Sequence, residues 1–286
     1  MATNQQRREA AKRKLERQLV RRAERAKRRR IIGVGVTVGV VVVVAGLVVI
    51  LTNQGGDDNN AANANPGESS AEAPPASDIN IPTQRAPEPK RPEPLPNPVS
   101  CDYPAGEQAA KPVEPPKGGD VPSDGTVGVT LQTTAGDIPI TLDRALAPCA
   151  VNSFINLVEQ DFYTDSACHR LGTTGLQMLQ CGDPTGQGTG GPGYTFADEV
   201  FDSLTYGRGI LAMANSGPDT NGSQFFMVYG EAPLTPDYTV FGTISDEGLK
   251  VIDKVARGGD DGRYDPSPGG GAPNIEVKFT GATVDA

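Results

Sequence analysis

Apolar residues are arranged along this chain in two different ways. Residues 31–51 form one uninterrupted run dominated by Val, Ile, Leu and Gly. After residue 122, apolar residues instead alternate with polar ones over short intervals, as expected of elements that face a core. The region between them, residues 53–121, contains few large apolar side chains. The pattern predicts an anchor, a linker and one folded domain.

The apolar run has the length of a membrane-spanning helix. Its 21 residues carry no charge, and a helix of that length spans the hydrocarbon core of a bilayer, roughly 30 Å. A cleaved signal peptide has a shorter apolar core followed by small residues, whereas this run ends in Leu-Thr-Asn-Gln. Residues 31–52 are therefore predicted to be a transmembrane helix, with a signal peptide as the alternative.

Charge is distributed unevenly on the two sides of this run. Residues 1–30 carry 13 Lys or Arg against 3 Glu, and the rest of the chain carries 32 acidic against 13 basic residues. The basic arm predicts a cytoplasmic N-terminus and an extracytoplasmic domain at the cell membrane. The arm is interpreted as the positive flank of the anchor, with contact to lipid headgroups or nucleic acid as the alternative. No nucleic-acid binding is expected of the acidic remainder.

Residues 53–121 have the composition of a linker. They are rich in Pro, Ala, Asn and Glu, and they bury too little apolar surface to order themselves. We predict a disordered spacer with extended Pro-rich stretches; recognition by a proline-binding partner is the alternative. Cys101 lies in this spacer, and in an oxidising compartment it is a candidate to pair with a cysteine of the domain.

The C-terminal region, residues 122–286, is predicted to be mainly β. Residues 128–133 and 137–142 alternate apolar and polar positions around a Thr-Ala-Gly turn, which predicts a hairpin. Further strands are predicted at residues 167–171, 176–181, 209–213, 224–229, 238–244 and 274–280. Many short strands with Gly-rich connections indicate a closed barrel or a sandwich.

Two helices are predicted within this domain. Pro148 begins the first, whose apolar positions recur at helical spacing at Val151, Phe154, Ile155 and Val158. The second is predicted to begin at Ser245 or Asp246 and to face inward through Leu249, Ile252 and Val255. Two isolated helices suit the two ends of a barrel.

The cysteines and the single histidine, His169, do not predict a metal site. The four cysteines include no Cys-x-x-Cys pair, whereas zinc sites need about four closely spaced nitrogen or sulfur ligands. Cys168 and Cys181 fall in predicted strands that are candidates to be neighbours. A bridge between them requires Cα atoms less than about 7 Å apart.

Six ordered segments of the domain resemble cyclophilins. They are His169-Arg170, Leu-Gln-Cys-Gly-Asp at 179–183, Gly-Thr-Gly-Gly at 188–191, Gly-Ile-Leu-Ala-Met-Ala-Asn-Ser-Gly-Pro at 209–218, Asn-Gly-Ser-Gln-Phe-Phe at 221–226 and Val-Phe-Gly at 240–242. The resemblance covers roughly residues 123–286. It implies an eight-stranded antiparallel closed β-barrel capped by two α-helices, with peptidyl-prolyl cis–trans isomerase activity.

The resemblance implies that Arg170 is the central group of the site. Rotation about an X–Pro bond is slow because amide resonance sets a barrier of about 18–20 kcal/mol. Only interactions that are stronger with the twisted amide accelerate it. Arg170 is expected to donate to the prolyl carbonyl and the imide nitrogen, and Gln180 is expected to orient Arg170 and contact the substrate backbone. No cofactor or metal is expected.

The same resemblance assigns further residues to catalysis and substrate binding. Phe226, Met178 and Leu234 are expected to form the apolar floor and wall that take the proline ring, with Tyr238 as an aromatic wall. Ala214 and Asn215 are expected to offer backbone hydrogen bonds to the residue before proline. Gln224 is expected to contribute its side-chain amide, and Gly188 to belong to the loop beside a secondary pocket.

The chain departs from the family pattern around the proline pocket. It has two more residues between Arg170 and Gln180 than the best-known members, and Gln177 stands where the family often has a phenylalanine. Pro233 replaces a rim tryptophan, and Tyr238 replaces a histidine. Because loss of the indole removes a donor and apolar area, we expect weak cyclosporin binding with activity retained.

The sequence therefore predicts a single-pass, outward-facing prolyl isomerase that acts on proline-containing segments of exported or cell-envelope proteins. The alternative is an envelope chaperone or peptide-binding module with little turnover. Measurable turnover of an X–Pro peptide separates the two.

Overall fold

The computed structural model describes residues 79–285. The predicted basic arm, the predicted transmembrane helix and the first part of the predicted linker lie outside the described residues. Between residues 79 and 285, no helix has the length and apolar character needed to cross a bilayer.

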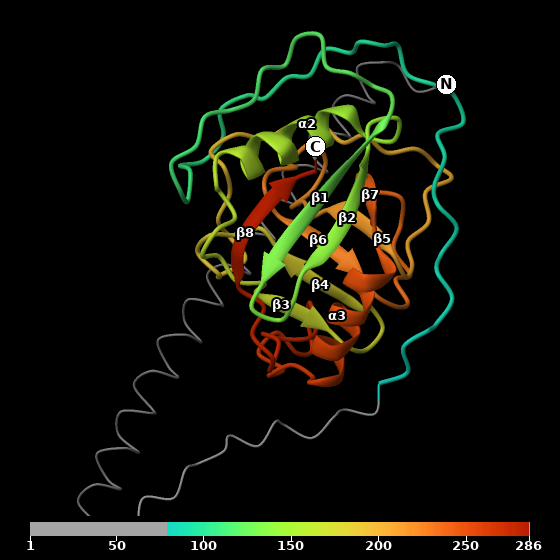
Figure 1. Cartoon of the computed structure of the whole chain (residues 1–286), viewed down its shortest axis with the longest axis vertical. Helices are drawn as coiled ribbons and strands as arrows, with labels where there is room; N and C mark the ends of the chain where they lie inside the picture. The colour runs from blue at the N-terminus through green and yellow to red at the C-terminus, as the bar shows by residue number, and fades with distance from the viewer. Residues whose placement is uncertain (1–78, 286) are drawn as a thin grey trace, which may run out of the picture. The chain divides into compact units, whose positions relative to one another are not determined.

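Eight strands form one sheet, which is flanked by two helices (Figure 1). All strand pairs are antiparallel, and the strand order is β3-β4-β6-β5-β7-β2-β1-β8. The mainly β class and the number of strands and helices predicted for the domain are confirmed. The strands are β1 (Thr126–Thr133), β2 (Ile138–Asp143), β3 (Arg170–Gly172), β4 (Met178–Cys181), β5 (Ile210–Met213), β6 (Phe225–Val228), β7 (Val240–Ile244) and β8 (Phe279–Val284), and the helices are α2 (Pro148–Glu159) and α3 (Asp246–Arg257).

The sheet curls into a half-barrel that is open between β3 and β8, so the predicted closed barrel is wrong on this point. Next to the two end strands, an isolated bridge between Ala167 and Lys278 connects the two sides of the gap. The free edge of β3 is instead occupied by a loop, because Leu171 pairs with Gly271. A strand of three residues whose edge is already taken cannot also form a ladder with β8.

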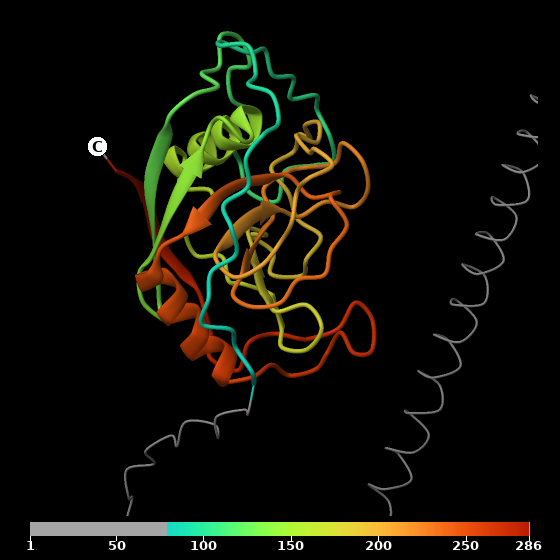
Figure 2. The same cartoon turned by 90° about the vertical axis from the view of Figure 1, so that its right-hand side faces the viewer.

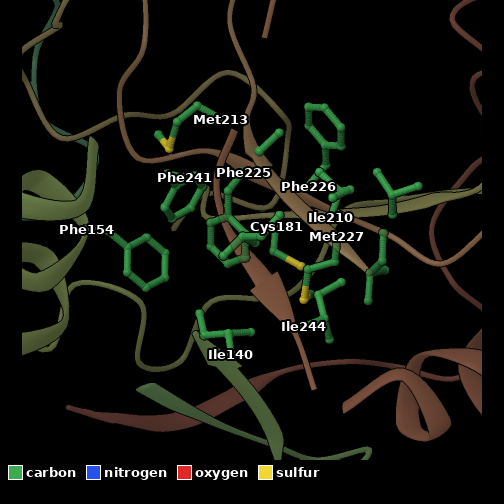
Figure 3. Close-up of a cluster of buried hydrophobic side chains, with 14 of the residues drawn as sticks. Ile140, Phe154, Cys181, Ile210, Met213, Phe225, Phe226, Met227, Phe241 and Ile244 are labelled. Carbon is green, nitrogen blue, oxygen red and sulfur yellow. The ribbon is translucent and has the colours of Figure 1, made fainter. Parts of the chain in front are cut away.

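The two helices begin and pack as their apolar spacing predicts. In α2, Val151, Phe154 and Val158 are buried, whereas Ile155 is only partly so. The ring of Phe154 reaches into the core and lies 5.2 Å from the ring of Phe225 (Figure 3). Such edge-on aromatic pairs stabilise a core beyond the area that they bury.

Helix α3 has a side-chain cap. The Ser245 hydroxyl accepts a hydrogen bond from Gly248 N at 3.0 Å, which satisfies one of the free amides of the first turn. Leu249, Ile252 and Val255 are all buried, as predicted.

The last strand begins later than its sequence predicts. The sequence predicts a strand at residues 274–280, but β8 covers Phe279–Val284. The Asn274 side chain donates to Gly258 O at 3.0 Å and so holds the beginning of the expected segment in a loop. β8 then pairs with β1, with a register shift between Gln132 and Thr133.

Residues 79–121, here called the strap, are ordered against the domain, so the prediction of a disordered linker is wrong for this part. The strap runs from the α3 end of the sheet to the α2 end (Figure 2). Arg85 donates to Ile244 O at 2.7 Å, and Arg91 donates to Leu146 O at 3.0 Å. The strap has too few apolar residues to form a core of its own, and these bonds to the backbone of the domain order it instead.

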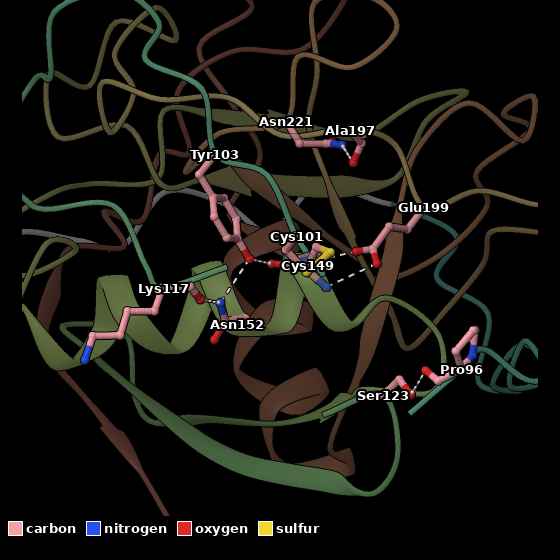
Figure 4. Close-up of a disulfide and its surroundings, with 11 residues drawn as sticks. Pro96, Cys101, Tyr103, Lys117, Ser123, Cys149, Asn152, Ala197, Glu199 and Asn221 are labelled. Carbon is pink, nitrogen blue, oxygen red and sulfur yellow. Dashed lines mark hydrogen bonds between the residues drawn. A yellow bond between two sulfur atoms is a disulfide. The ribbon is translucent and has the colours of Figure 1, made fainter. Parts of the chain in front are cut away.

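A disulfide between Cys101 and Cys149 fastens the strap to the first turn of α2 (Figure 4). The Tyr103 hydroxyl supports the junction by donating to Cys149 O at 2.8 Å and accepting from Asn152 Nδ2 at 3.0 Å. Cys101 is only 5% exposed. The expectation that Cys101 pairs with a cysteine of the domain is confirmed.

Candidate active site

Arg170 is the first residue of β3 and is directly paired with Gln180 of β4. Its guanidinium Nη1 lies 3.5 Å from Gln180 Oε1. Partial burial lowers the pKa of Arg170, and the nearby Tyr238 and Tyr264 phenols partly offset this effect. An arginine keeps its charge at neutral pH in such surroundings, so the site presents a fixed cation.

A disulfide between Cys168 and Cys181 holds β3 and β4 together at this point. The two Cα atoms are 4.0 Å apart, and both side chains are buried. The expectation that these two cysteines lie on neighbouring segments is confirmed. Because Cys168 is two residues before Arg170 and Cys181 follows Gln180, the bridge restrains both site residues.

The register of the sheet places Arg170, Gln180 and Phe226 in one row. Gln180 pairs with Arg170 on one side and with Phe226 of β6 on the other, and Phe226 pairs in turn with Ala212 of β5. Directly paired residues of adjacent strands point to the same face of a sheet. Met178 is two residues before Gln180 on β4 and so belongs to this face as well.

Aromatic rings extend the apolar end of this row. The Phe226 ring is 5.6 Å from the Tyr238 ring in an edge-on arrangement. The Tyr206 hydroxyl fixes the backbone of Tyr238, since it donates to Tyr238 O at 2.8 Å and accepts from Tyr238 N at 3.0 Å. Leu234 is half-buried against the core. A cation and an aromatic, apolar surface thus adjoin on one face of the sheet.

Side-chain amides connect the row to a neighbouring cavity. Gln180 Nε2 donates to Gln224 Oε1 at 3.0 Å, and Gln224 Nε2 donates to Gly190 O at 3.0 Å. The cavity has a volume of about 510 Å³, and its lining includes Gln180, Gln224, Gly188, Ala214 and Asn215. The Asn215 side chain donates to Asp237 O at 2.8 Å.

The predicted site residues therefore fall into two groups. The first group belongs to the row or its aromatic extension and does not line the cavity; it consists of Arg170, Phe226, Met178, Leu234 and Tyr238. Gln180 and Gln224 join the two groups through their amides.

Gln177 lies outside both groups. Its Oε1 accepts from Glu231 N at 2.8 Å, and its Nε2 donates to Asn80 O of the strap at 2.9 Å. At 7% exposure it is a buried amide that ties two loops together.

Sequence reasoning missed Asp183, which organises the loop beside the cavity. Burial raises the pKa of Asp183, but hydrogen bonds from backbone amides and from the Thr185 hydroxyl outweigh burial and lower it. Its carboxylate accepts from Thr185 N at 2.7 Å, Gln187 N at 3.2 Å and Thr189 N at 3.0 Å. The aspartate at the beginning of a Gly- and Thr-rich loop is the sequence signal by which this role could have been found.

The strap residues Gly106, Glu107 and Gln108, which also line the cavity, were likewise missed. They lie in a segment of linker-like composition, more than seventy positions before Gln180 in the chain. No feature of the local sequence signals that they reach the site.

Comparison with known proteins identifies the family of the chain. The family described as cyclophilin type peptidyl-prolyl cis-trans isomerase/CLD matches residues 128–277. The chain is 46% identical to a probable peptidyl-prolyl cis-trans isomerase B of Mycobacterium leprae over 308 aligned positions, which cover all of both chains. It is 44% identical over 207 residues to a probable isomerase B of Mycobacterium tuberculosis, covering 65% of this chain and 64% of that protein. A cyclophilin-type isomerase of Cryptosporidium parvum matches with a TM-score of 0.49 at 32% identity, covering 57% of this chain and 99% of that one.

The chain belongs to the cyclophilin-type peptidyl-prolyl cis–trans isomerase family. It is an enzyme that accelerates rotation about X–Pro peptide bonds in proline-containing peptides.

Proposed function

We propose that Arg170 is the catalytic cation of this isomerase and that Phe226 takes the proline ring. The support is the row on β3, β4 and β6, which sets the guanidinium and the aromatic ring on either side of Gln180. A donor directed at the prolyl carbonyl and imide nitrogen favours the twisted amide, in which the nitrogen lone pair has left resonance. Such a donor binds the transition state better than the planar ground state and so raises the rate.

The remaining site residues bind the chain on either side of the proline. Met178, Leu234 and Tyr238 complete the apolar and aromatic surroundings of Phe226. Ala214 and Asn215 offer their backbone to the residue before proline, and the Gln224 amide and Gly188 border the cavity that receives the residues further along. Their positions around the cavity and beside the row support these roles.

The test is isomerisation of an X–Pro peptide by the full chain and its variants, followed by NMR exchange. We expect Arg170→Ala to lower kcat/KM by about 100-fold, the scale of losing one transition-state donor. Arg170→Lys is expected to recover little, because a lysine lacks the rigid fork. Arg144→Ala, a change next to the end of β2, is the control and retains full activity. Equal rates for Arg170→Ala and the unchanged chain contradict the proposal.

The enzyme is proposed to act outside the cytoplasm on exported or cell-envelope proteins, held by the predicted helix at residues 31–52. Two disulfides in the described residues support this location, because disulfides persist mainly in oxidising compartments. Added protease should digest the domain in spheroplasts, in which the outer face of the membrane is accessible. It should not digest the domain in sealed inside-out membrane vesicles, in which that face is enclosed. Removal of residues 1–52 should release the domain from the membrane fraction. Recovery of the domain in the cytosol contradicts the proposal.

Weak cyclosporin binding is proposed from the altered rim of the proline pocket. Pro233, at the position of the family's tryptophan, is exposed and carries no side-chain donor. The expected result is inhibition only at micromolar drug or above. Inhibition at nanomolar concentrations contradicts this part of the proposal.

A further inference from the structure

Arg170 is held by a loop that lies far from it in the sequence. Residues 261–271, here called the Arg170 loop, connect the end of α3 with the segment that leads to β8. Arg170 Nε donates to Gly269 O at 2.9 Å, and Nη2 donates to Pro268 O at 2.8 Å. Two of the three guanidinium nitrogens are therefore fixed by backbone carbonyls of this loop. The third, Nη1, makes only the long 3.5 Å contact with Gln180 and is the donor best placed to turn to a substrate.

The tip of the loop is stabilised by its own hydrogen bonds. Asp265 Oδ1 accepts from Gly270 N at 2.9 Å. Tyr264 N donates to Gly270 O at 2.9 Å, and Gly269 N donates to Tyr264 O at 3.0 Å. These bonds close a small ring of backbone around the carbonyls that contact Arg170. The acceptors are thereby held in fixed positions even though the tip is exposed.

The loop is also fastened to the strand that carries Arg170. Leu171 N donates to Gly271 O at 2.7 Å, and Gly271 N donates to Leu171 O at 3.1 Å. Gly270 approaches this strand so closely that a Cβ would lie 2.1 Å from Leu171 O, and its φ is +78°. A residue with a side chain cannot occupy this position without displacing the loop.

The loop presents neutral carbonyl acceptors, and not a carboxylate, to the guanidinium of Arg170. Of its acidic residues, Asp261 accepts from the Arg263 side chain and from the backbone amide that follows the loop, and Asp265 accepts from Gly270 N. A carboxylate would form a bidentate pair with the guanidinium and neutralise it. Carbonyl dipoles orient the group while its full charge remains available to the substrate.

We propose that the Arg170 loop is a positioning element for catalysis, which holds the guanidinium so that Nη1 faces the substrate carbonyl. This inference rests on the catalytic role proposed for Arg170. Its residues act through Arg170 and do not themselves contact the reacting bond.

Asp265 gives the first test, because it is exposed and its loss leaves the core untouched. Asp265→Ala removes the acceptor for Gly270 N, and Asp265→Asn keeps an oxygen in the same place. We expect kcat of the full chain to fall roughly tenfold in the alanine variant with KM nearly unchanged, since a displaced catalytic group slows the chemical step. The asparagine variant is expected to restore most of the activity.

Gly270→Ala gives the second test, with Gly175→Ala as its matched control. Both glycines have positive φ, +78° and +72°, but a Cβ at Gly175 meets nothing within 4 Å. The two variants therefore share the backbone strain and differ in the clash with β3. The expected loss of kcat appears in Gly270→Ala and is absent in Gly175→Ala.

A spectroscopic measurement separates positioning from general loosening of the fold. In the unchanged chain the Arg170 Nε–H, bonded to Gly269 O, should exchange slowly with water and give a resolved NMR signal. The signal should disappear in Asp265→Ala and return in Asp265→Asn, while the amide signals of the core stay unchanged.

The outcomes distinguish this inference from the role of Arg170 itself. If Arg170→Ala is fully active, the proposed catalytic role fails. If Arg170→Ala is impaired but both loop variants keep the kcat of their controls, or gain activity, the positioning inference alone is overturned. In an Arg170→Ala background, Asp265→Ala should cause no further loss of kcat; an additional tenfold loss there also overturns it.

Discussion

Arg170 and Gln180 are direct cross-strand partners. Arg170 Nη1 lies 3.5 Å from Gln180 Oε1, and this contact connects the guanidinium to the hydrogen-bonded side-chain amides of the site. Gln180 in turn donates to Gln224. The position of the guanidinium thus depends on a side chain from the neighbouring strand as well as on the loop carbonyls.

Replacing Gln180 by alanine should lower kcat for an X–Pro peptide by roughly tenfold, because the guanidinium loses one of the groups that orient it. Gln180→Glu should also be impaired, since a carboxylate pairs with the guanidinium and cannot donate to Gln224. Gln132→Ala on β1, which four strands separate from β4 in the sheet order, is the control. Full activity of Gln180→Ala contradicts the assigned role.

Glu199 should make the stability of the domain depend on pH. Its carboxylate accepts from Cys149 N and Ala150 N at the beginning of α2 (Figure 4). Burial nevertheless raises the pKa of Glu199 from 4.5 to about 7, against the opposing effect of these hydrogen bonds and of Arg91. The folded state therefore keeps the proton over a range of pH in which the unfolded state has released it.

The free energy of unfolding should accordingly fall as pH rises from about 4.5 to about 7, by an amount on the order of 3 kcal/mol for this group. Below pH 4.5 the contribution is fully present. Urea unfolding of the unchanged chain and of Glu199→Gln at several pH values measures the difference. A constant difference between the two across this range contradicts the raised pKa.

The disulfide of the strap should contribute more stability than the disulfide beside the site. Cys101 and Cys149 are 48 positions apart in the chain, and Cys168 and Cys181 are 13 apart. In the chain-entropy account, loops of these lengths correspond to about 4 and about 3 kcal/mol. Denaturant unfolding of the two double serine variants compares them. The Cys101 and Cys149 variant should also become sensitive to proteolysis within the strap first; a strap that stays resistant contradicts its dependence on the bridge.

Removing only one partner of the ion pair between Arg208 and Asp253 should lower the free energy of unfolding substantially. Both oxygens of Asp253 accept from the guanidinium, at 2.7 and 2.8 Å, and the side chains are only 10% and 16% exposed. Arg208→Ala should lower the free energy of unfolding by about 3 kcal/mol, because it leaves a largely buried carboxylate without its partner. The double change Arg208→Met with Asp253→Leu should cost less than the single change. Thermal unfolding decides this, and a double variant less stable than Arg208→Ala contradicts the argument.

Local patterns were sufficient for much of the domain. Helical spacing at Val151 and Phe154 located α2, and the inward-facing positions from Leu249 to Val255 located α3. The run of motif residues around Arg170 and Phe226 identified the family and both ends of the row on β3, β4 and β6. These features are readable because periodic burial, helix caps and site chemistry each require particular side chains at fixed spacings.

Tertiary structure alone decided how distant segments meet the site. The strap is ordered although its composition predicts a linker, and the gap between β3 and β8 stays open because Gly271 occupies the edge of β3. Arg170 is held by Gly269, which is 99 residues away. Every residue carries a backbone carbonyl, so the choice of one carbonyl as the partner of an arginine leaves no mark on the sequence and is fixed only when the chain has folded.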